Sequence, residues 1–256
     1  MPPLSTATRR RLIGLVPRDL RNKVPRDHLE SDAAFTRRRR VVAGVSLAGA
    51  ALLGRSLSTE PDSKEFYGLT LGVAATWAAG AFASGPLHLG WEQDADERLK
   101  RPCATPVAMG VASFGAFYGA ALVARRIPVL NRALTEILAF ADQGSAPLVS
   151  LTTLANGAAE EVFFRGALYA AVGTEHPVAK STAVYALATT ATRNPALVLA
   201  GGVMGTLFGL QRRASGGIQA PMLTHLTWSI LMLRHMPPLF RREGHDEVRA
   251  ELPPQP

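Results

Sequence analysis

Two adjacent carboxylates and an arginine lie in an apolar part of the chain. They belong to the segment Ala159-Glu160-Glu161-Val162-Phe163-Phe164-Arg165-Gly166, and apolar residues flank it on both sides. Charged side chains inside apolar helices are costly, so they are candidates for a functional site. In a helix, Glu161 and Arg165 share one face, and a glutamate that precedes a basic residue by four positions favours an ion pair. We therefore expect Glu161 and Arg165 to brace this helix.

Glu160 is placed differently from its neighbour. It lies about 100° away from Glu161 around the helix axis, so it can face other surroundings without a cationic partner of its own. A carboxylate that faces an apolar cavity can act as a general base on a water molecule. The alternative is a purely structural ion-pair network that contains all three charged residues, and the pattern alone does not decide between the two.

A second candidate group lies further along the chain, in the uncharged run 214–233. His225 is in the middle of this run, and Ser229 follows four residues later, on the same helical face. A histidine and a hydroxyl on one face can hold a water or stabilise an oxyanion. The alternative is a core histidine whose only role is packing.

Helices must position these side chains, because uncharged runs occupy much of the chain. The five longest runs without Asp, Glu, Lys or Arg are 66–91, 102–124, 143–159, 194–211 and 214–233. Only helices or closed barrels span a bilayer, and these runs are too long and too rich in Ala, Leu and Gly for barrel strands. The sequence predicts an all-α, polytopic transmembrane helical bundle with about six to eight membrane helices.

The expected spans are 41–57, 66–88, 105–125, 145–172, 180–192, 195–211 and 218–236, with a further short helix within 129–142. The segment 145–172 is too long for one simple span, so we expect it to break, tilt or contain a re-entrant part. Glycines at GxxxG spacing predict close helix packing. They are Gly201, Gly205 and Gly209 in one run, and Gly115 and Gly119 in another.

The charge is concentrated at the N-terminus. The net charge is +8, and residues 1–40 hold eleven Arg and Lys against four Asp and Glu. This arm ends in Arg37-Arg38-Arg39-Arg40, directly before an apolar run, which predicts a cytoplasmic N-terminus and contact with anionic lipid. Phe35 is the single aromatic residue of this arm, too few to stack on successive bases, which argues against nucleic acid as a partner. A cleaved export signal is the alternative, but no clear A-x-A site follows, which favours an uncleaved anchor.

These patterns predict three parts of an integral membrane protein. Residues 1–40 form a basic cytoplasmic arm, residues 41–240 form a transmembrane domain, and residues 241–256 form a polar, disordered tail. The motifs concentrate in residues 155–232 of the middle part.

The Glu160-Glu161-x-x-x-Arg165 motif resembles the first signature of the CPBP family. This family comprises polytopic helical intramembrane proteases, including type II CAAX prenyl endopeptidases and Abi or bacteriocin-processing proteins. The resemblance covers residues 105–236, most clearly 155–232. Relatives of this size are typically bacterial, so it implies an integral protein of a bacterial cell membrane.

Two further signatures of the family have partial matches. Its second signature is Phe-x-x-x-His, and here Tyr185 takes the aromatic position while Thr189 stands in place of His. Its third signature is His-x-x-x-Asn, and here His225 is present while Ser229 stands in place of Asn. Both replacements keep a hydroxyl, so the cavity stays polar at these positions.

The resemblance implies cleavage of a membrane-associated peptide or protein. Glu160 would activate a water, His225 would position that water or stabilise the oxyanion, and Ser229 would donate in place of the Asn amide. Thr189 would be the fourth catalytic position. The residues that would support the site are Glu161, Arg165 and Tyr185.

The resemblance also raises the question of a metal. The candidate ligands reduce to Glu160, Glu161 and His225, because threonine is a poor zinc ligand. We therefore favour a glutamate mechanism without zinc or another cofactor.

Two other functions remain open from the sequence. Losing one oxyanion donor commonly costs about 10²–10³ in rate, so the changes at Thr189 and Ser229 allow a catalytically impaired family member that acts as a membrane-binding or immunity-type scaffold. The third possibility is a small transporter or proton pathway that uses Glu160, although charges are scarce in the apolar runs outside this helix.

Overall fold

The computed structural model describes residues 30–94 and 96–240. Most of the predicted basic arm, residues 1–29, and the predicted tail, residues 241–256, lie outside the described residues. The all-α prediction is confirmed for the described residues, which also contain one small hairpin between the predicted spans 66–88 and 105–125. In this hairpin, β1 (Glu92–Gln93) pairs antiparallel with β2 (Leu99–Lys100).

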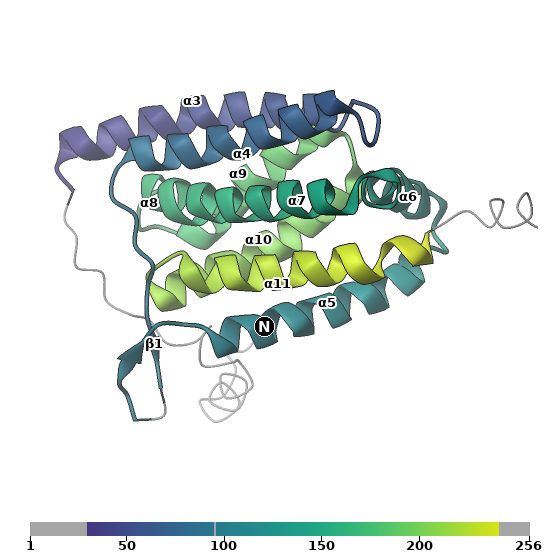
Figure 1. The fold of residues 1–256 in the computed structure, drawn as a ribbon. Coiled ribbons are helices and arrows are strands. Elements are labelled where there is room, and N and C mark those ends of the chain that lie inside the picture. The colour runs from purple at the N-terminus through teal and green to yellow at the C-terminus, as the bar shows by residue number, and fades with distance from the viewer. Residues whose placement is uncertain (1–29, 95, 241–256) are drawn as a thin grey trace, which may run out of the picture.

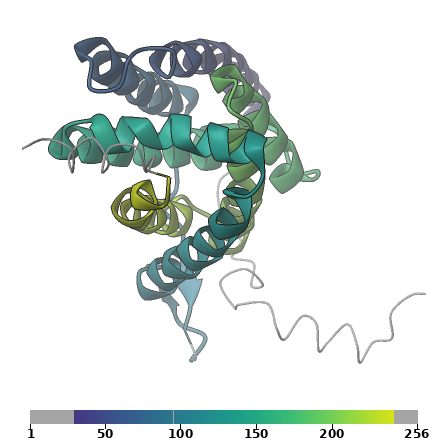
Figure 2. The same cartoon turned by 90° about the vertical axis from the view of Figure 1, so that its right-hand side faces the viewer.

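The long helices run side by side, with the hairpin at one end of the bundle and α6 at the other (Figure 1). Seen from the second end, α6 lies across the bundle (Figure 2). The α-helices are α3 (Asp32–Ser56), α4 (Lys64–Ser84), α5 (Ala104–Ala124), α6 (Pro128–Gln143), α7 (Ala146–Glu160), α8 (Tyr169–Ala171), α9 (Pro177–Thr189), α10 (Pro195–Ser215) and α11 (Gln219–His235). A π-helical segment, Glu161–Leu168, joins α7 to α8, and 3₁₀ turns occupy Thr190–Thr192 and Pro237–Leu239.

The first helix of the described residues, α3, begins earlier than the span predicted at 41–57. Ser31 caps α3 by accepting a hydrogen bond from the Ala34 N–H at 3.2 Å, so the arginine block belongs to the helix rather than to a separate arm. Arg38 is completely buried and forms an ion pair with Glu30. Its Nη1 also donates to Ser84 Oγ of α4 at 3.2 Å. A buried cation needs such partners, and the sequence reasoning did not anticipate this one.

The long segment predicted at 145–172 is helical from Ala146 to Ala171. The predicted break is instead a change of winding, because α7 passes directly into the π-helical segment at Glu161 and then into α8. Every residue of the π-helical segment is buried. Such wider turns occur often at functional sites, since they turn side chains away from the ordinary helical register.

The core lies around this π-helical segment. The fully buried Trp77 of α4 packs its ring against Phe163 and Phe164, with centroids 4.7 and 4.9 Å apart. Around this core α3 packs on α4, α5 on α11, and α9 on α10, while α7 contacts both α4 and α11. The two charged residues of the π-helical segment, Glu161 and Arg165, therefore lie in the centre of the bundle rather than on its surface.

Close packing at one of the two glycine runs is confirmed. A Cβ added at Gly205 would lie 3.1 Å from Thr182 Cγ2, and one added at Gly209 would lie 3.0 Å from Val178 Cγ1, so α10 approaches α9 closely. The other prediction is wrong for the described residues, where a Cβ at Gly115 or Gly119 would meet nothing within 4 Å. GxxxG spacing allows close approach but does not require it.

Two helices of the described segments, α4 and α5, are long and apolar enough to cross a membrane. The apolar side chains Val107, Val111 and Val123 of α5 are exposed on the protein surface. In water such a surface is unfavourable, whereas lipid tails would cover it.

Candidate functional site

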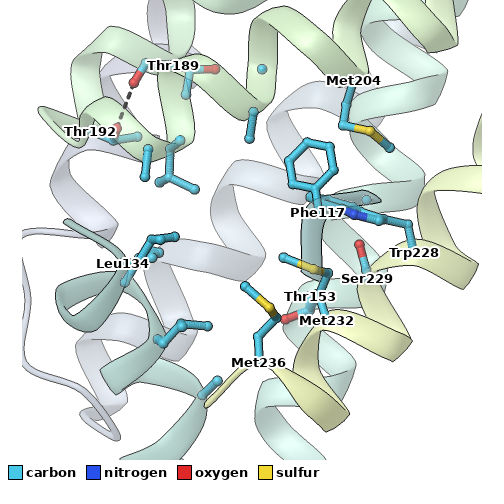
Figure 3. A pocket seen from close by; sticks show the side chains of 18 of the residues that line it. Phe117, Leu134, Thr153, Thr189, Thr192, Met204, Trp228, Ser229, Met232 and Met236 are labelled. Carbon is cyan, nitrogen blue, oxygen red and sulfur yellow. Dashed lines mark hydrogen bonds between the residues drawn. The ribbon is translucent and has the colours of Figure 1, made fainter. Parts of the chain in front are cut away.

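A cavity of about 1000 Å³ lies inside the bundle, and its lining contains all four predicted catalytic residues and Tyr185. Most of the remaining lining is apolar, with residues from α5, α6, α7, α10 and α11 among others. Figure 3 shows Thr189 on the α9 side of this cavity and Trp228, Ser229 and Met232 on the α11 side. The structure thus gathers three motifs that are distant in sequence around one largely apolar space.

Glu160 is the last residue of α7, at the point where the winding changes. Its Oε2 accepts a hydrogen bond from the Tyr185 hydroxyl at 2.7 Å. This contact joins the first motif to the second, and the sequence reasoning placed Tyr185 only in a supporting role. Among the described residues, Oε1 receives no hydrogen bond, which leaves that oxygen for a water or a substrate group.

Glu161 is fully buried and lies between two basic groups. Its Oε1 is 3.3 Å from Arg165 Nη1, so the predicted pairing with Arg165 is present. The same oxygen is 2.9 Å from His225 Nδ1. Spacing could not reveal this second contact, because the two residues are 64 positions apart. Glu161 therefore links the first motif to the third.

The contact with Glu161 orients the His225 ring. A carboxylate accepts hydrogen bonds, so His225 Nδ1 carries the proton that is donated to Glu161. In the neutral ring, Nε2 is then the nitrogen that can accept a hydrogen bond. Phe208 stacks on the ring with centroids 4.9 Å apart and an interplanar angle of 23°. Gly157 also lines the cavity and lies beside the Nε2 edge of the His225 ring, where an added Cβ would be 3.6 Å from Nε2.

The two replaced positions behave differently. Thr189 is buried, and its Oγ1 donates to the Tyr185 main-chain oxygen at 2.9 Å, a bond to the preceding turn of its own helix. Ser229 is buried one turn after His225, and both residues line the cavity as their shared face predicts. The Thr189 hydroxyl thus donates its proton to the backbone, whereas the Ser229 hydroxyl lies at the cavity.

Arg165 reaches beyond Glu161 to the aromatic residues of the site. Its guanidinium lies over the Tyr185 ring at 4.6 Å and over the Phe208 ring at 5.0 Å. Cations are attracted to aromatic faces, so this buried charge has favourable contacts besides its carboxylate partner. The main-chain oxygen of Arg165 accepts a hydrogen bond from Arg212 Nε at 2.7 Å, a buried contact that the sequence reasoning missed.

Asn156 is a further polar residue of the cavity that the sequence reasoning missed. Its Nδ2 donates to the main-chain oxygens of Thr70 and Thr152, both at 2.9 Å, and so ties α7 to α4. It precedes Glu160 by four residues, which places both side chains on one face of α7. This spacing was the available signal.

The residues of the cavity suit a metal ion poorly. Of the three candidate ligands, Glu160 and His225 line the cavity, whereas the buried Glu161 pairs with Arg165 and His225 through one oxygen. The described part of the chain contains no group of three His, Cys, Asp or Glu side chains that could hold a metal ion. Zinc sites ordinarily need at least three such protein ligands.

The comparisons with known proteins support the family resemblance over the same region. Residues 142–231 match the family model described as "Rce1-like: Type II CAAX prenyl endopeptidase Rce1-like". This stretch runs from the end of α6 into α11 and contains every predicted site residue. Neither the curated proteins nor the solved structures yielded a match. The resemblance to the CPBP family of membrane proteases is therefore confirmed, and it rests on the Rce1-like segment at residues 142–231.

Proposed function

We propose that this protein is an intramembrane endopeptidase that cleaves a membrane-associated peptide or protein, with Glu160 as the general base. The observation that carries this proposal is the common cavity of Glu160 and His225, in which Glu161 orients the histidine and Tyr185 holds Glu160. An apolar cavity with a few convergent polar groups is typical of a binding site for a small or extended ligand.

In the proposed reaction, Glu160 Oε1 takes a proton from a water molecule, and the water oxygen attacks the scissile carbonyl carbon. His225 Nε2 accepts the second hydrogen bond of this water and so fixes its direction. The Ser229 hydroxyl donates to the oxyanion that forms. The proton on Glu160 then passes to the departing amine as the peptide C–N bond breaks. No metal takes part in this scheme.

The membrane arrangement belongs to the same proposal. We place the protein in a bacterial cell membrane with about six to eight helices across the bilayer and a cytoplasmic N-terminus. In the described part of the arginine block, Arg37, Arg39 and Arg40 are exposed, which is consistent with contact to anionic lipid headgroups. Arg38 is excluded from this role because it is buried against Glu30.

The test compares peptides in membranes from cells that produce the wild-type protein, Glu160→Gln or His225→Ala. We expect at least one membrane-associated peptide to be cleaved only in wild-type cells, because each variant loses a group that acts on the water. Arg213→Gln, at an exposed residue outside the cavity, serves as a control and keeps wild-type cleavage. Identical peptide profiles for wild type and Glu160→Gln would contradict the proposal.

A specific observation favours one other function. The Thr189 hydroxyl is bonded to the backbone, so the position where the family has histidine offers no free donor to a substrate. A catalytically impaired relative that only binds a membrane peptide would tolerate this. For that function, Glu160→Gln should retain capture of a crosslinkable partner while no cleaved product forms in wild type.

A further inference from the structure

We propose that Tyr185 is a positioning residue that holds the Glu160 carboxylate in its reactive orientation and supplies the polar contact that Thr189 does not. This inference rests on the proposed function, since it concerns the same carboxylate. It goes further because it assigns to Tyr185 a defined role in the reaction, beyond support of the helix packing.

The contact between the two side chains is direct. The Tyr185 hydroxyl donates to Glu160 Oε2 at 2.7 Å, a distance typical of a strong hydrogen bond to a charged acceptor. Because a carboxylate rotates readily about its last bond, one firm hydrogen bond is enough to choose its orientation. The bond engages Oε2, and Oε1 is thereby left as the oxygen that meets the water.

The Tyr185 ring is itself held from three sides. Phe164 packs against it with centroids 4.6 Å apart, and the Arg165 guanidinium lies over it at 4.6 Å. On the α10 side, a Cβ added at Gly205 would be 3.2 Å from Tyr185 Cδ1, and one at Gly201 would be 3.7 Å from Cε1. The glycine run thus seats the ring, and the hydroxyl has a fixed position before any substrate enters.

Thr189 provides the contrast. It lies one turn after Tyr185 on α9 and lines the same cavity, yet its Oγ1 donates to the Tyr185 main-chain oxygen at 2.9 Å. The helix therefore offers its side-chain donor to Glu160 at position 185 instead of position 189. A phenylalanine at 185 would keep the ring and its packing but remove this donor.

The first test is Tyr185→Phe, assayed by steady-state kinetics in liposomes on a cleaved peptide. We expect kcat to fall about 10–100-fold, the range for loss of one hydrogen bond to a charged group, while KM stays within about twofold. In the folded variant, a purely structural role would instead alter KM. Tyr118→Phe is the matched control, because Tyr118 lies on α5 outside the cavity lining, and it should keep wild-type kcat.

The second test is rescue by Tyr185→Phe combined with Thr189→His. A histidine one turn along the same face can donate to Glu160, so kcat should recover at least about tenfold relative to the single variant. If Tyr185→Phe does not fold, Gly205→Ala replaces it. The added Cβ displaces the ring but keeps the hydroxyl, and the same loss of kcat is expected.

The outcomes separate this inference from the function on which it rests. Wild-type kcat in Tyr185→Phe, together with an inactive Glu160→Gln, would overturn the role of Tyr185 and leave the proposed function standing. Equal cleavage by wild type and Glu160→Gln would overturn the proposed function itself. A loss of kcat in Tyr185→Phe that Thr189→His does not rescue would also count against the inference that Tyr185 supplies the hydrogen bond that Thr189 does not.

Discussion

Adjacent glutamates have different surroundings in this protein, although their residue type is the same. Glu161 is fully buried and shares one oxygen between Arg165 and His225, whereas Glu160 lines the cavity and contacts Tyr185. Removing one member of a buried ion pair leaves its partner desolvated and uncompensated. Glu160 is therefore suited to chemistry, and Glu161 to holding the site together.

This difference predicts that two substitutions change stability by very different amounts. Glu161→Ala should lower the free energy of unfolding by about 3–5 kcal/mol, because Arg165 remains buried without its carboxylate. Glu160→Gln keeps an oxygen that can accept from Tyr185, so stability should change by less than about 1 kcal/mol. Unfolding of both variants in detergent micelles measures this. Equal destabilisation would show that the two carboxylates share one structural network.

At the scale of elements, the position of α10 against α9 determines where Tyr185 lies. Gly205 stands at this contact, with Thr182 and Tyr185 facing it, while Gly115 on α5 faces open space in the described structure. Both glycines occur at GxxxG spacing, so the sequence alone treats them alike. In the described part of the chain they differ, because a Cβ added at Gly205 would contact α9 and a Cβ added at Gly115 would contact nothing within 4 Å.

The two glycines give a matched pair of alanine variants. Gly205→Ala should cost about 1–3 kcal/mol through overpacking and should lower kcat by displacing the Tyr185 ring. Gly115→Ala should keep full activity, and removing a flexible glycine from a helix should stabilise it by about 0.5–1 kcal/mol. Thermal unfolding and cleavage rate check both. Full activity in Gly205→Ala would mean that the glycine seat is not needed.

The helices themselves were largely predictable. Uncharged runs marked α4, α5, α10 and α11 to within a few residues, because apolar composition determines where a helix can be buried or meet lipid. The early start of α3 was not predictable, since it depends on Arg38 finding Glu30 and Ser84. The π-helical winding at Glu161 also depends on packing that no local pattern encodes.

The site was predictable only in part. Residue types and a family resemblance pointed to Glu160 and His225, and helical spacing pointed to the ion pair of Glu161 and Arg165. The contact of Glu161 with His225 joins residues 64 positions apart, and such contacts follow from the tertiary fold alone. The same holds for the hydrogen bond between Tyr185 and Glu160.

At the scale of the whole molecule, one polar junction joins the loop before α4 to the start of α7. The Asp62 carboxylate accepts from the Tyr67 hydroxyl at 2.7 Å and from the Ser145 N–H at 3.0 Å. These two hydrogen bonds hold the pKa of Asp62 below its ordinary value of 3.8, and the bond from Tyr67 has the larger effect. A group whose pKa is depressed by folding stabilises the folded state only while it is ionised.

The junction predicts a pH-dependent difference between wild type and Asp62→Asn. Wild type should be the more stable protein above about pH 4, and its advantage should shrink as the pH falls further and Asp62 is protonated. Unfolding measurements from pH 7 down to about pH 3 test this. A difference that stays constant across this range would exclude Asp62 as the titrating group.

The bundle also predicts that α5 crosses the bilayer. Cys103 is free and exposed directly before α5, and Arg126 is exposed just after it. A membrane-impermeant maleimide should therefore label Cys103 from one side of oriented vesicles. It should label Arg126→Cys, made in a Cys103→Ser background, from the other side. Labelling of both positions from the same side would contradict the span.

The central claim is that Glu160 activates a water that cleaves a peptide bond. The most direct measurement uses a peptide that is found cleaved in wild-type membranes. Purified protein in liposomes cleaves this peptide in ¹⁸O-labelled water. Wild type should place one ¹⁸O atom in the new carboxylate, and Glu160→Gln should slow the reaction by about 10²–10⁴-fold. Cleavage by Glu160→Gln at the wild-type rate would contradict the claim.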